Sequence, residues 1–208
     1  MKKIFSIAPI ALFIILTSFE AEAKTETTKT KIVIEGVKSK QYEINTSKST
    51  IVWKGKAVTH SQTGNLSVNS GNFTLENNSV VSGTIEIDMT SLTVSSIPPE
   101  SENNAKLVEH LKTDDFFNVA KFPTATLTIT DGSDMNNIKA NITIKGLTEE
   151  ITFTLSSAKK NGVITLTSSL KIDRTKFDVT YSSGNFFENL GDHLIHDEFE
   201  LNVTLVST

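Results

Sequence analysis

The fourteen residues HLKTDDFFNVAKFP, from His110 to Pro123, bring together one histidine, two adjacent aspartates and three phenylalanines. A histidine beside carboxylates can perform general acid–base chemistry. The same residues also fit the end of a helix, where the dipole favours an imidazolium and Asp114 and Asp115 turn the chain into the following loop. The phenylalanines indicate an apolar surface. The stretch is therefore compatible with a catalytic site, a metal site or the wall of a hydrophobic pocket.

The motifs of catalytic and metal sites are missing from the sequence. The chain has no cysteine and no G-x-S-x-G nucleophile motif. Its four histidines form no H-E-x-x-H or Cys/His cluster, and His193 and His196 would point to opposite faces of a strand. We predict no catalytic residue, no metal site and no cofactor. A hydrolase that uses His110 and nearby carboxylates is the weaker alternative.

Arg174, in KIDRTKFDVTY, lies near the end of a predicted strand. It can pair with Asp173 or another carboxylate as a structural cation. It can also meet the polar head of an amphiphile at the mouth of a pocket. The sequence leaves both roles open, and Arg174 and His110 are the residues that we place nearest a head group.

Pairs of adjacent phenylalanines occur in two loop-like segments, FFNVAKFP and GNFFENLGD. Successive side chains of a strand point to opposite faces, so two neighbours cannot both serve one buried face. The pairs either plug one end of the domain as ordinary core or line the opening of an apolar pocket.

The elements that position these residues are mostly strands. Apolar residues alternate with polar ones in successive runs from Tyr42 to Leu205, and Gly, Asn and Ser separate the runs. About eight to ten short strands indicate an antiparallel all-β domain, a barrel or a sandwich. One short helix is predicted in SENNAKLVEHLKTDD, with Ser101 as N-cap, and a weaker helical turn in GNFFENLGD. A closed barrel removes sheet edges and can be solid or hold one small ligand.

The N-terminal sequence and the composition predict export, the bounds of the folded domain and the kinds of partner. Lys2 and Lys3, an apolar run and Ala21-Glu22-Ala23 predict a cleaved signal peptide over residues 1–23. A flexible lead-in is expected over 24–40 and one folded domain over 41–208. The net charge of −4, without a basic stripe, indicates no nucleic-acid partner. An exported chain without cysteine needs a core that is stable without disulfides.

Five blocks of the sequence resemble the YceI-like lipid-binding family: SKSTIVWKGKAVTHSQTGNLSVNSGNFTL, GTIEIDMTSLTV, LVEHLKTDDFFNVAKFPTATLTIT, NITIKGLTEEITFTL and KIDRTKFDVTYSSGNFFENLGDHLIHDEFELNVTLV. They occur in the order and spacing of the family, over about residues 42 to 206. One departure is Gln62, which stands where the family commonly has a histidine before the Thr-Gly pair.

The resemblance implies an antiparallel, lipocalin-like β-barrel of about eight strands with one short helix and a helical turn. It also implies a periplasmic protein that holds a long isoprenoid or similar amphiphile, such as a polyprenyl chain, quinone or fatty acid derivative, for transport or storage. The expected partners are a hydrophobic small molecule and, transiently, a membrane, for a monomer or homodimer. A stress-related structural barrel without a ligand is the alternative. We predict ligand contact for inward-facing and aromatic residues of the matching blocks, namely Trp53, Met89, Leu107, His110, Leu111, Phe116, Phe117, Phe122, Leu127, Ile129, Arg174, Phe177, Phe186 and Phe187.

Overall fold

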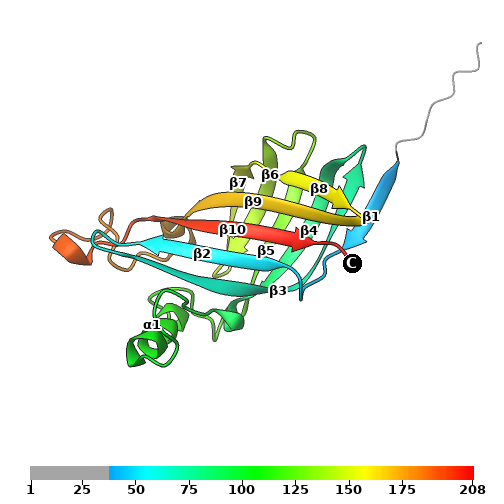
Figure 1. The fold of residues 1–208 in the computed structure, drawn as a ribbon. Coiled ribbons are helices and arrows are strands. Elements are labelled where there is room, and N and C mark those ends of the chain that lie inside the picture. The colour runs from blue at the N-terminus through cyan, green and yellow to red at the C-terminus, as the bar shows by residue number, and fades with distance from the viewer. Residues whose placement is uncertain (1–37) are drawn as a thin grey trace, which may run out of the picture. The chain divides into compact units, whose positions relative to one another are not determined.

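A computed structural model describes residues 38–208, which form one ten-stranded antiparallel sheet with a single α-helix (Figure 1). The predicted signal peptide and nearly all of the predicted lead-in lie outside the described residues. The all-β class is confirmed. The strands are β1 (Ser39–Glu43), β2 (Thr50–Lys56), β3 (Ser61–Glu76), β4 (Ser79–Asp88), β5 (Thr124–Asp131), β6 (Ile138–Ile144), β7 (Leu147–Phe153), β8 (Ser156–Lys160), β9 (Val163–Asp173) and β10 (Glu198–Val206).

The helical elements are few and short. The α-helix α1 covers Glu102–Lys112, and three 3-10 helices cover Met89–Ser91 (η1), Arg174–Phe177 (η2) and Gly191–His193 (η3). Ser101 caps α1 as predicted, accepting a hydrogen bond from the Asn103 backbone N–H at 3.3 Å. The helical turn expected in GNFFENLGD is found at its C-terminal end, as η3. No helix in the described part of the chain is long and apolar enough to span a membrane.

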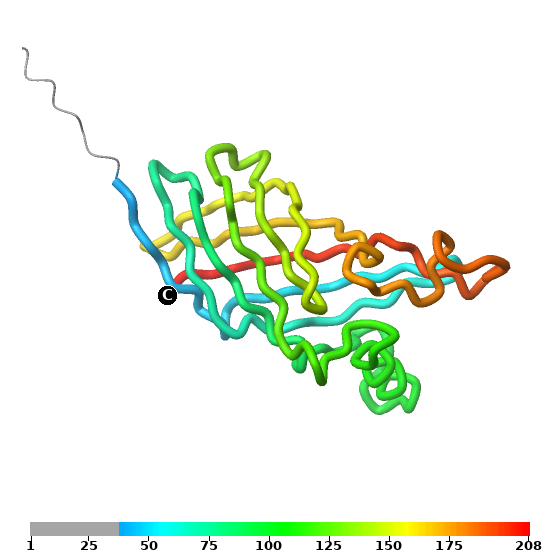
Figure 2. The backbone as a smooth tube through the Cα atoms, turned by 180° about the vertical axis from the view of Figure 1, so that it is seen from behind, coloured from blue at the N-terminus to red at the C-terminus, as the bar shows by residue number. Residues whose placement is uncertain are grey.

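The sheet curls because β3 has different partners along its length. The first half of β3 pairs with β2, from Ser61 to Leu66, and its second half pairs with β1 and β4. A register shift between Val68 and Ser70 lies where the partners change, and such irregularities bend and twist a strand. The strand order is β7-β6-β5-β4-β3-β2-β10-β9-β8, with β1 paired to β3 off this path, and the sheet wraps into a barrel-like shape (Figure 2).

The barrel differs from the predicted closed one at its seam. β7 and β8 end the strand order, and no backbone ladder joins them in the described residues. β8 has only five residues and pairs with β9 no further than Thr167, so within residues 38–208 the rest of β9 has no ladder partner on that side. There the Ser168 hydroxyl of β9 donates to the Thr154 carbonyl, next to β7, at 2.7 Å. Lys159 and Lys160 on β8 protect the open edge from pairing with another strand.

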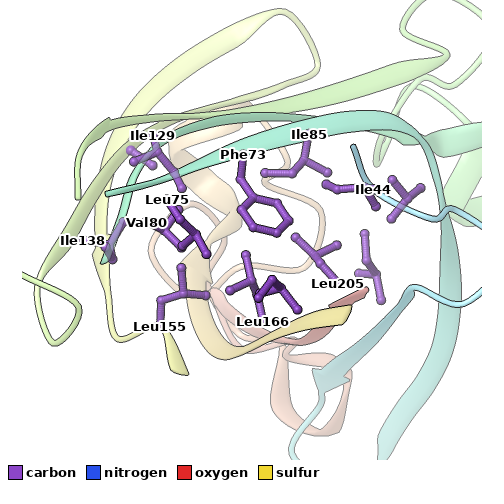
Figure 3. Packing of buried hydrophobic residues seen from close by; sticks show 14 residues of the cluster. Ile44, Phe73, Leu75, Val80, Ile85, Ile129, Ile138, Leu155, Leu166 and Leu205 are labelled. Carbon is purple, nitrogen blue, oxygen red and sulfur yellow. The ribbon is translucent and has the colours of Figure 1, made fainter. Parts of the chain in front are cut away.

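One end of the barrel is filled by a packed core. Phe73 lies at the centre of this cluster, surrounded by aliphatic side chains from the strands around it (Figure 3). Ile138, Val80 and Phe73 are almost completely buried. The cluster forms because inward-facing residues of the period-two runs converge here. It closes this end to solvent.

Candidate ligand-binding cavity

The other part of the barrel encloses a cavity of about 530 Å³. This volume lies within the range of about 300–1,000 Å³ that is typical of small-molecule sites. Apolar residues from eight strands form the wall, and Leu66, Leu127 and Leu201 represent three of these strands. These leucines face inward but are only half-buried, because they border open space rather than other side chains. The interior is therefore hollow in the middle of the barrel and filled at the packed end. We call this end the floor of the cavity, and Phe73 and Leu155 close it.

Helix α1 and the loop after it supply the apolar part of the lid. Leu107 and Leu111 on α1, and Phe116 and Phe117 in the loop, line the cavity. His110 Nε2 lies 3.2 Å from Asp115 Oδ2, and the imidazole packs in T-shaped geometry with Phe116 and Tyr181, at centroid distances of 5.0 and 4.8 Å. The histidine thus joins the lid to the loop that carries Tyr181, and it does not line the cavity.

Trp53 forms part of the wall near the mouth, and its position depends on Gly64. The two residues are paired across β2 and β3. The indole Nε1–H donates to the Thr93 carbonyl at 3.0 Å. A Cβ at position 64 would lie 1.8 Å from that carbonyl oxygen and 2.6 Å from the indole nitrogen. Only a glycine leaves room for the indole and the backbone at residue 93 to pack over β3.

Polar side chains gather at the open end of the cavity. Lys56, His60, Gln62, Asp192, His193 and His196 line the cavity there. The Lys56 ammonium is 3.2 Å from Glu200 Oε1, and this contact lowers the pKa of the Glu200 carboxyl. His193 is in η3 and His196 precedes β10, so the strand assumed for them in sequence is not present. In residues 38–208 no group of three or more His, Cys, Asp or Glu is arranged to hold a metal ion.

Arg174 is a structural cation in this arrangement. It is 4% exposed, and its guanidinium donates to three backbone carbonyls: Nε to His196 at 3.1 Å, Nη1 to Val179 at 2.7 Å and Nη2 to Ile195 at 2.9 Å. Asp197 Oδ1 lies 3.6 Å from Nη2. Burial lowers the pKa of Arg174, while Asp197 and Asp173 act in the opposite direction. The side chain also borders the cavity, but three of its five N–H groups already donate to carbonyls of the segment between η2 and β10.

Nine of the fourteen residues predicted to contact a ligand line the cavity: Trp53, Met89, Leu107, Leu111, Phe116, Phe117, Leu127, Ile129 and Arg174. Their contact with a ligand stays a prediction. The structure places the other five, His110, Phe122, Phe177, Phe186 and Phe187, outside the lining.

Each of these five has a physical reason for its place. His110 is held by Asp115 and two rings, as described above. Phe122 packs close to Gly146, whose added Cβ would lie 2.8 Å from the ring. Phe177 is 1% exposed within the core beside the cavity. Phe186 and Phe187 are exposed on the loop before η3.

Several lining residues were not singled out from the sequence, among them Leu66, Ile87, Phe199, Leu201 and Val203. Their signal was present, since all five occupy the apolar positions of alternating runs. Alternation identifies the inward face of a strand but does not separate residues that pack solidly from those that border a hollow.

The fold and the cavity define a β-barrel of the kind that can enclose one small hydrophobic ligand. The chain belongs to the YceI-like domain family, which matches residues 42–207. A UPF0312 protein of Shewanella denitrificans is 31% identical over 86 residues, which is 39% of this chain and 42% of that relative. The match thus spans less than half of the relative's length.

Two solved structures share the fold. BcnA of Burkholderia cenocepacia aligns with a TM-score of 0.60 at 19% identity, over 79% of this chain and 99% of its own. A polyisoprenoid binding domain from Saccharophagus degradans, implicated in plant cell wall breakdown, aligns with a TM-score of 0.59 at 14% identity, over 80% of this chain and 97% of its own. At these identities the likeness concerns the fold.

Proposed function

We propose that this protein binds one long isoprenoid or a similar amphiphile inside the barrel, for transport or storage. The observation that carries the proposal is the apolar cavity of about 530 Å³, closed at the floor and open at a polar mouth. Membership of the YceI-like family supports it. The Saccharophagus degradans domain of the same fold, which is named for polyisoprenoid binding, gives further support.

The cavity wall suits a hydrocarbon tail because it offers apolar contact along its length. Leu66, Leu127 and Leu201 present accessible apolar surface that a tail would cover. Each buried methylene contributes about 0.8 kcal/mol before the loss of chain freedom is subtracted. We infer that tail length controls affinity more than head-group chemistry does.

The mouth favours an uncharged head, such as a quinone or an alcohol, over a diphosphate. Its two cations are already engaged, the exposed Lys56 by Glu200 and the buried Arg174 by three carbonyls. Asp192 adds a negative charge at the same end. A diphosphate would therefore meet no unengaged lysine or arginine among the lining residues, and its desolvation would be uncompensated.

The proposal includes export and the absence of catalysis. A cleaved signal peptide at residues 1–23 would deliver the domain to the periplasm, which N-terminal sequencing of the exported protein tests. A hydrolase using His110 is less well supported, because His110 is outside the cavity lining and is held by Asp115. A structural barrel without a ligand is less well supported because the interior is hollow.

The test is a titration of the delipidated protein with prenyl alcohols of increasing length. Trp53 is the only tryptophan of the chain and lines the cavity, so its fluorescence reports binding. We expect affinity to rise by about tenfold or more for each added isoprene unit until the cavity is full. A prenyl diphosphate of the same length should bind no more tightly than the alcohol.

A pair of neighbouring substitutions controls the experiment. Leu127→Asn places an amide in the cavity, whereas Thr128→Asn changes the next residue of β5, which faces solvent. The first should weaken binding of the longest alcohol by about tenfold or more, and the second should leave it unchanged. If affinity ignores tail length, or if no prenyl alcohol binds to folded protein, the proposed function is wrong.

A further inference from the structure

Exposed apolar side chains gather around the mouth of the cavity. Six large apolar side chains stand out as exposed in residues 38–208. Four of them belong to two loops at the mouth: Val58 at 54%, Tyr181 at 40%, Phe186 at 57% and Phe187 at 49%. The other two, Leu147 at 44% and Val163 at 37%, begin strands β7 and β9. We refer to Val58, Tyr181, Phe186 and Phe187 as the apolar rim.

The two loops of the apolar rim are joined to each other and to the cavity. The Val58 N–H donates to the Leu194 carbonyl at 3.1 Å, and Ala57 pairs with Ile195. Both loops also supply cavity-lining residues, among them Ala57 from the first and Tyr181, Ser182 and His193 from the second. In Figure 1 the β2–β3 turn and the orange segment before β10 lie together at one end of the sheet. The rim therefore borders the opening through which a ligand would pass.

The backbone holds the phenylalanine pair in its exposed position. The N–H groups of Phe186 and Phe187 both donate to the Ser183 carbonyl, at 3.1 and 2.9 Å. Ser183 itself is completely buried. Asn185 Nδ2 donates to Asp197 Oδ2 at 2.6 Å, which ties the same turn to the residue beside Arg174. The turn is thus anchored from below, while its two aromatic side chains face solvent.

The charges of this loop indicate the kind of surface that it fits. Residues 184–192, GNFFENLGD, contain Glu188 and Asp192 and no lysine or arginine. A surface of high negative charge would repel the loop. Phenylalanines on a protein surface partition into the boundary between lipid head groups and acyl chains. In the other rim loop Lys56 lies two residues before Val58 and is paired with Glu200. Apolar side chains beside acidic residues and a paired lysine therefore match a bilayer whose head groups carry no net charge.

We propose that the apolar rim docks transiently on a lipid bilayer of zwitterionic head groups, with Phe186 and Phe187 inserted at the level of the acyl boundary. In this position the mouth faces the membrane, and a hydrophobic ligand passes between bilayer and cavity without crossing water. The proposal of a docking surface depends only on the exposed residues. Its use for ligand transfer rests on the proposed lipid-binding function.

Flotation with phosphatidylcholine vesicles tests the docking. The double variant Phe186→Ser/Phe187→Ser should lower the vesicle partition coefficient by about tenfold or more. Each substitution removes the favourable transfer of a phenyl ring from water into the bilayer. The matched control Leu147→Ser/Val163→Ser removes two exposed apolar side chains outside the rim and should change partition less than about twofold. Circular dichroism melts confirm that both variants are folded.

A second measurement follows transfer of a fluorescent prenyl alcohol from vesicles to the protein. Transfer through contact should become faster as vesicle concentration rises, and the Phe186/Phe187 variant should slow it while leaving the affinity for a short prenyl alcohol in solution unchanged. A wild-type protein that binds this alcohol but does not associate with vesicles overturns the docking and leaves the proposed function intact. Absence of alcohol binding refutes the proposed function instead, and vesicle association then decides the docking separately.

Two further outcomes contradict the proposal. Binding that increases strongly with phosphatidylglycerol, at a pH where histidines are neutral, would assign the membrane contact to cations elsewhere. Sedimentation that shows the phenylalanine variant dissociating a dimer, without vesicle binding by the wild type, would make the rim an interface between two copies of the chain.

Discussion

Replacing Arg174 separates a structural clamp from a ligand-binding cation. Arg174→Met keeps the apolar stem and removes a guanidinium that is 5% exposed and bonded to the carbonyls of Val179, Ile195 and His196. Those acceptors, together with the nearby Asp197 carboxylate, would then lack their donor. Removing one partner of a buried pair typically destabilises a protein by about 3–5 kcal/mol. Solvent screening reduces this value little at a site so deeply buried.

We expect Arg174→Met to lower the free energy of unfolding by about 3–5 kcal/mol, measured by urea denaturation with circular dichroism. For a domain of this size the midpoint of thermal unfolding should fall by roughly 10 °C. Arg174→Lys should recover only part of this loss, because one ammonium cannot reach three carbonyls that the planar guanidinium spans.

Lys176→Met is the matched control, since Lys176 is an exposed cation in the same 3-10 helix. It should change stability by no more than about 0.5 kcal/mol. The structural role of Arg174 is refuted if Arg174→Met lowers the free energy of unfolding by less than about 1 kcal/mol, the scale of one ordinary hydrogen bond. If that variant stays stable but loses affinity for a prenyl ligand, Arg174 acts on the head group instead.

Two other substitutions test the surroundings of the cavity. Gly64→Ala should displace the Trp53 indole, shift its fluorescence and destabilise the fold by about 1–3 kcal/mol, because the added Cβ would lie 1.8 Å from the Thr93 oxygen. Gly55→Ala on β2 meets nothing within 4 Å and should be neutral, so an equal effect of both changes would contradict the steric account. Asp88 accepts hydrogen bonds from Thr90, chiefly from its side chain, which lowers the pKa of Asp88 below its usual 3.8. The ionised carboxylate therefore stabilises the fold above pH 3.8, and this contribution is lost as pH falls through the lowered pKa. The stability advantage of wild type over Asp88→Asn, measured by urea denaturation at a series of pH values, should shrink below pH 3.8, and a constant advantage would refute this account.

The sequence predicts the strands and the helix of this fold better than it predicts how the sheet closes into a barrel. Alternation identified the inward faces, and Ser101 correctly marked the start of α1, because both signals depend on neighbouring residues. The open seam depends on how far β8 extends along β9. That length is set by pairing between strands and has no local signature.

The site shows the same division. Leu107, Leu111, Phe116 and Phe117 could be assigned to a lid because an amphipathic helix and a paired aromatic loop are local patterns. The role of Arg174 could not be assigned, because its acceptors are carbonyls of residues 179, 195 and 196. Every residue carries a carbonyl, so the side-chain sequence contains no trace of such a partner.

In the described part of the chain no ladder joins β7 to β8, and this seam affects how the interior can adapt to a ligand. A barrel hydrogen-bonded all the way round has a circumference fixed by its strand number and stagger. Here the Ser168–Thr154 hydrogen bond bridges the gap beside β8, and opening one such bond costs only about 0.5–1.5 kcal/mol. Apart from this bond the gap is bridged by packing of apolar side chains such as Leu155 and Leu166, so we expect the wall to widen more readily here than where a continuous ladder joins the strands. The cavity should therefore accept branched or bulky tails more readily than tails longer than the distance from mouth to floor. The protein would then select its ligand by the length of the tail more than by its width.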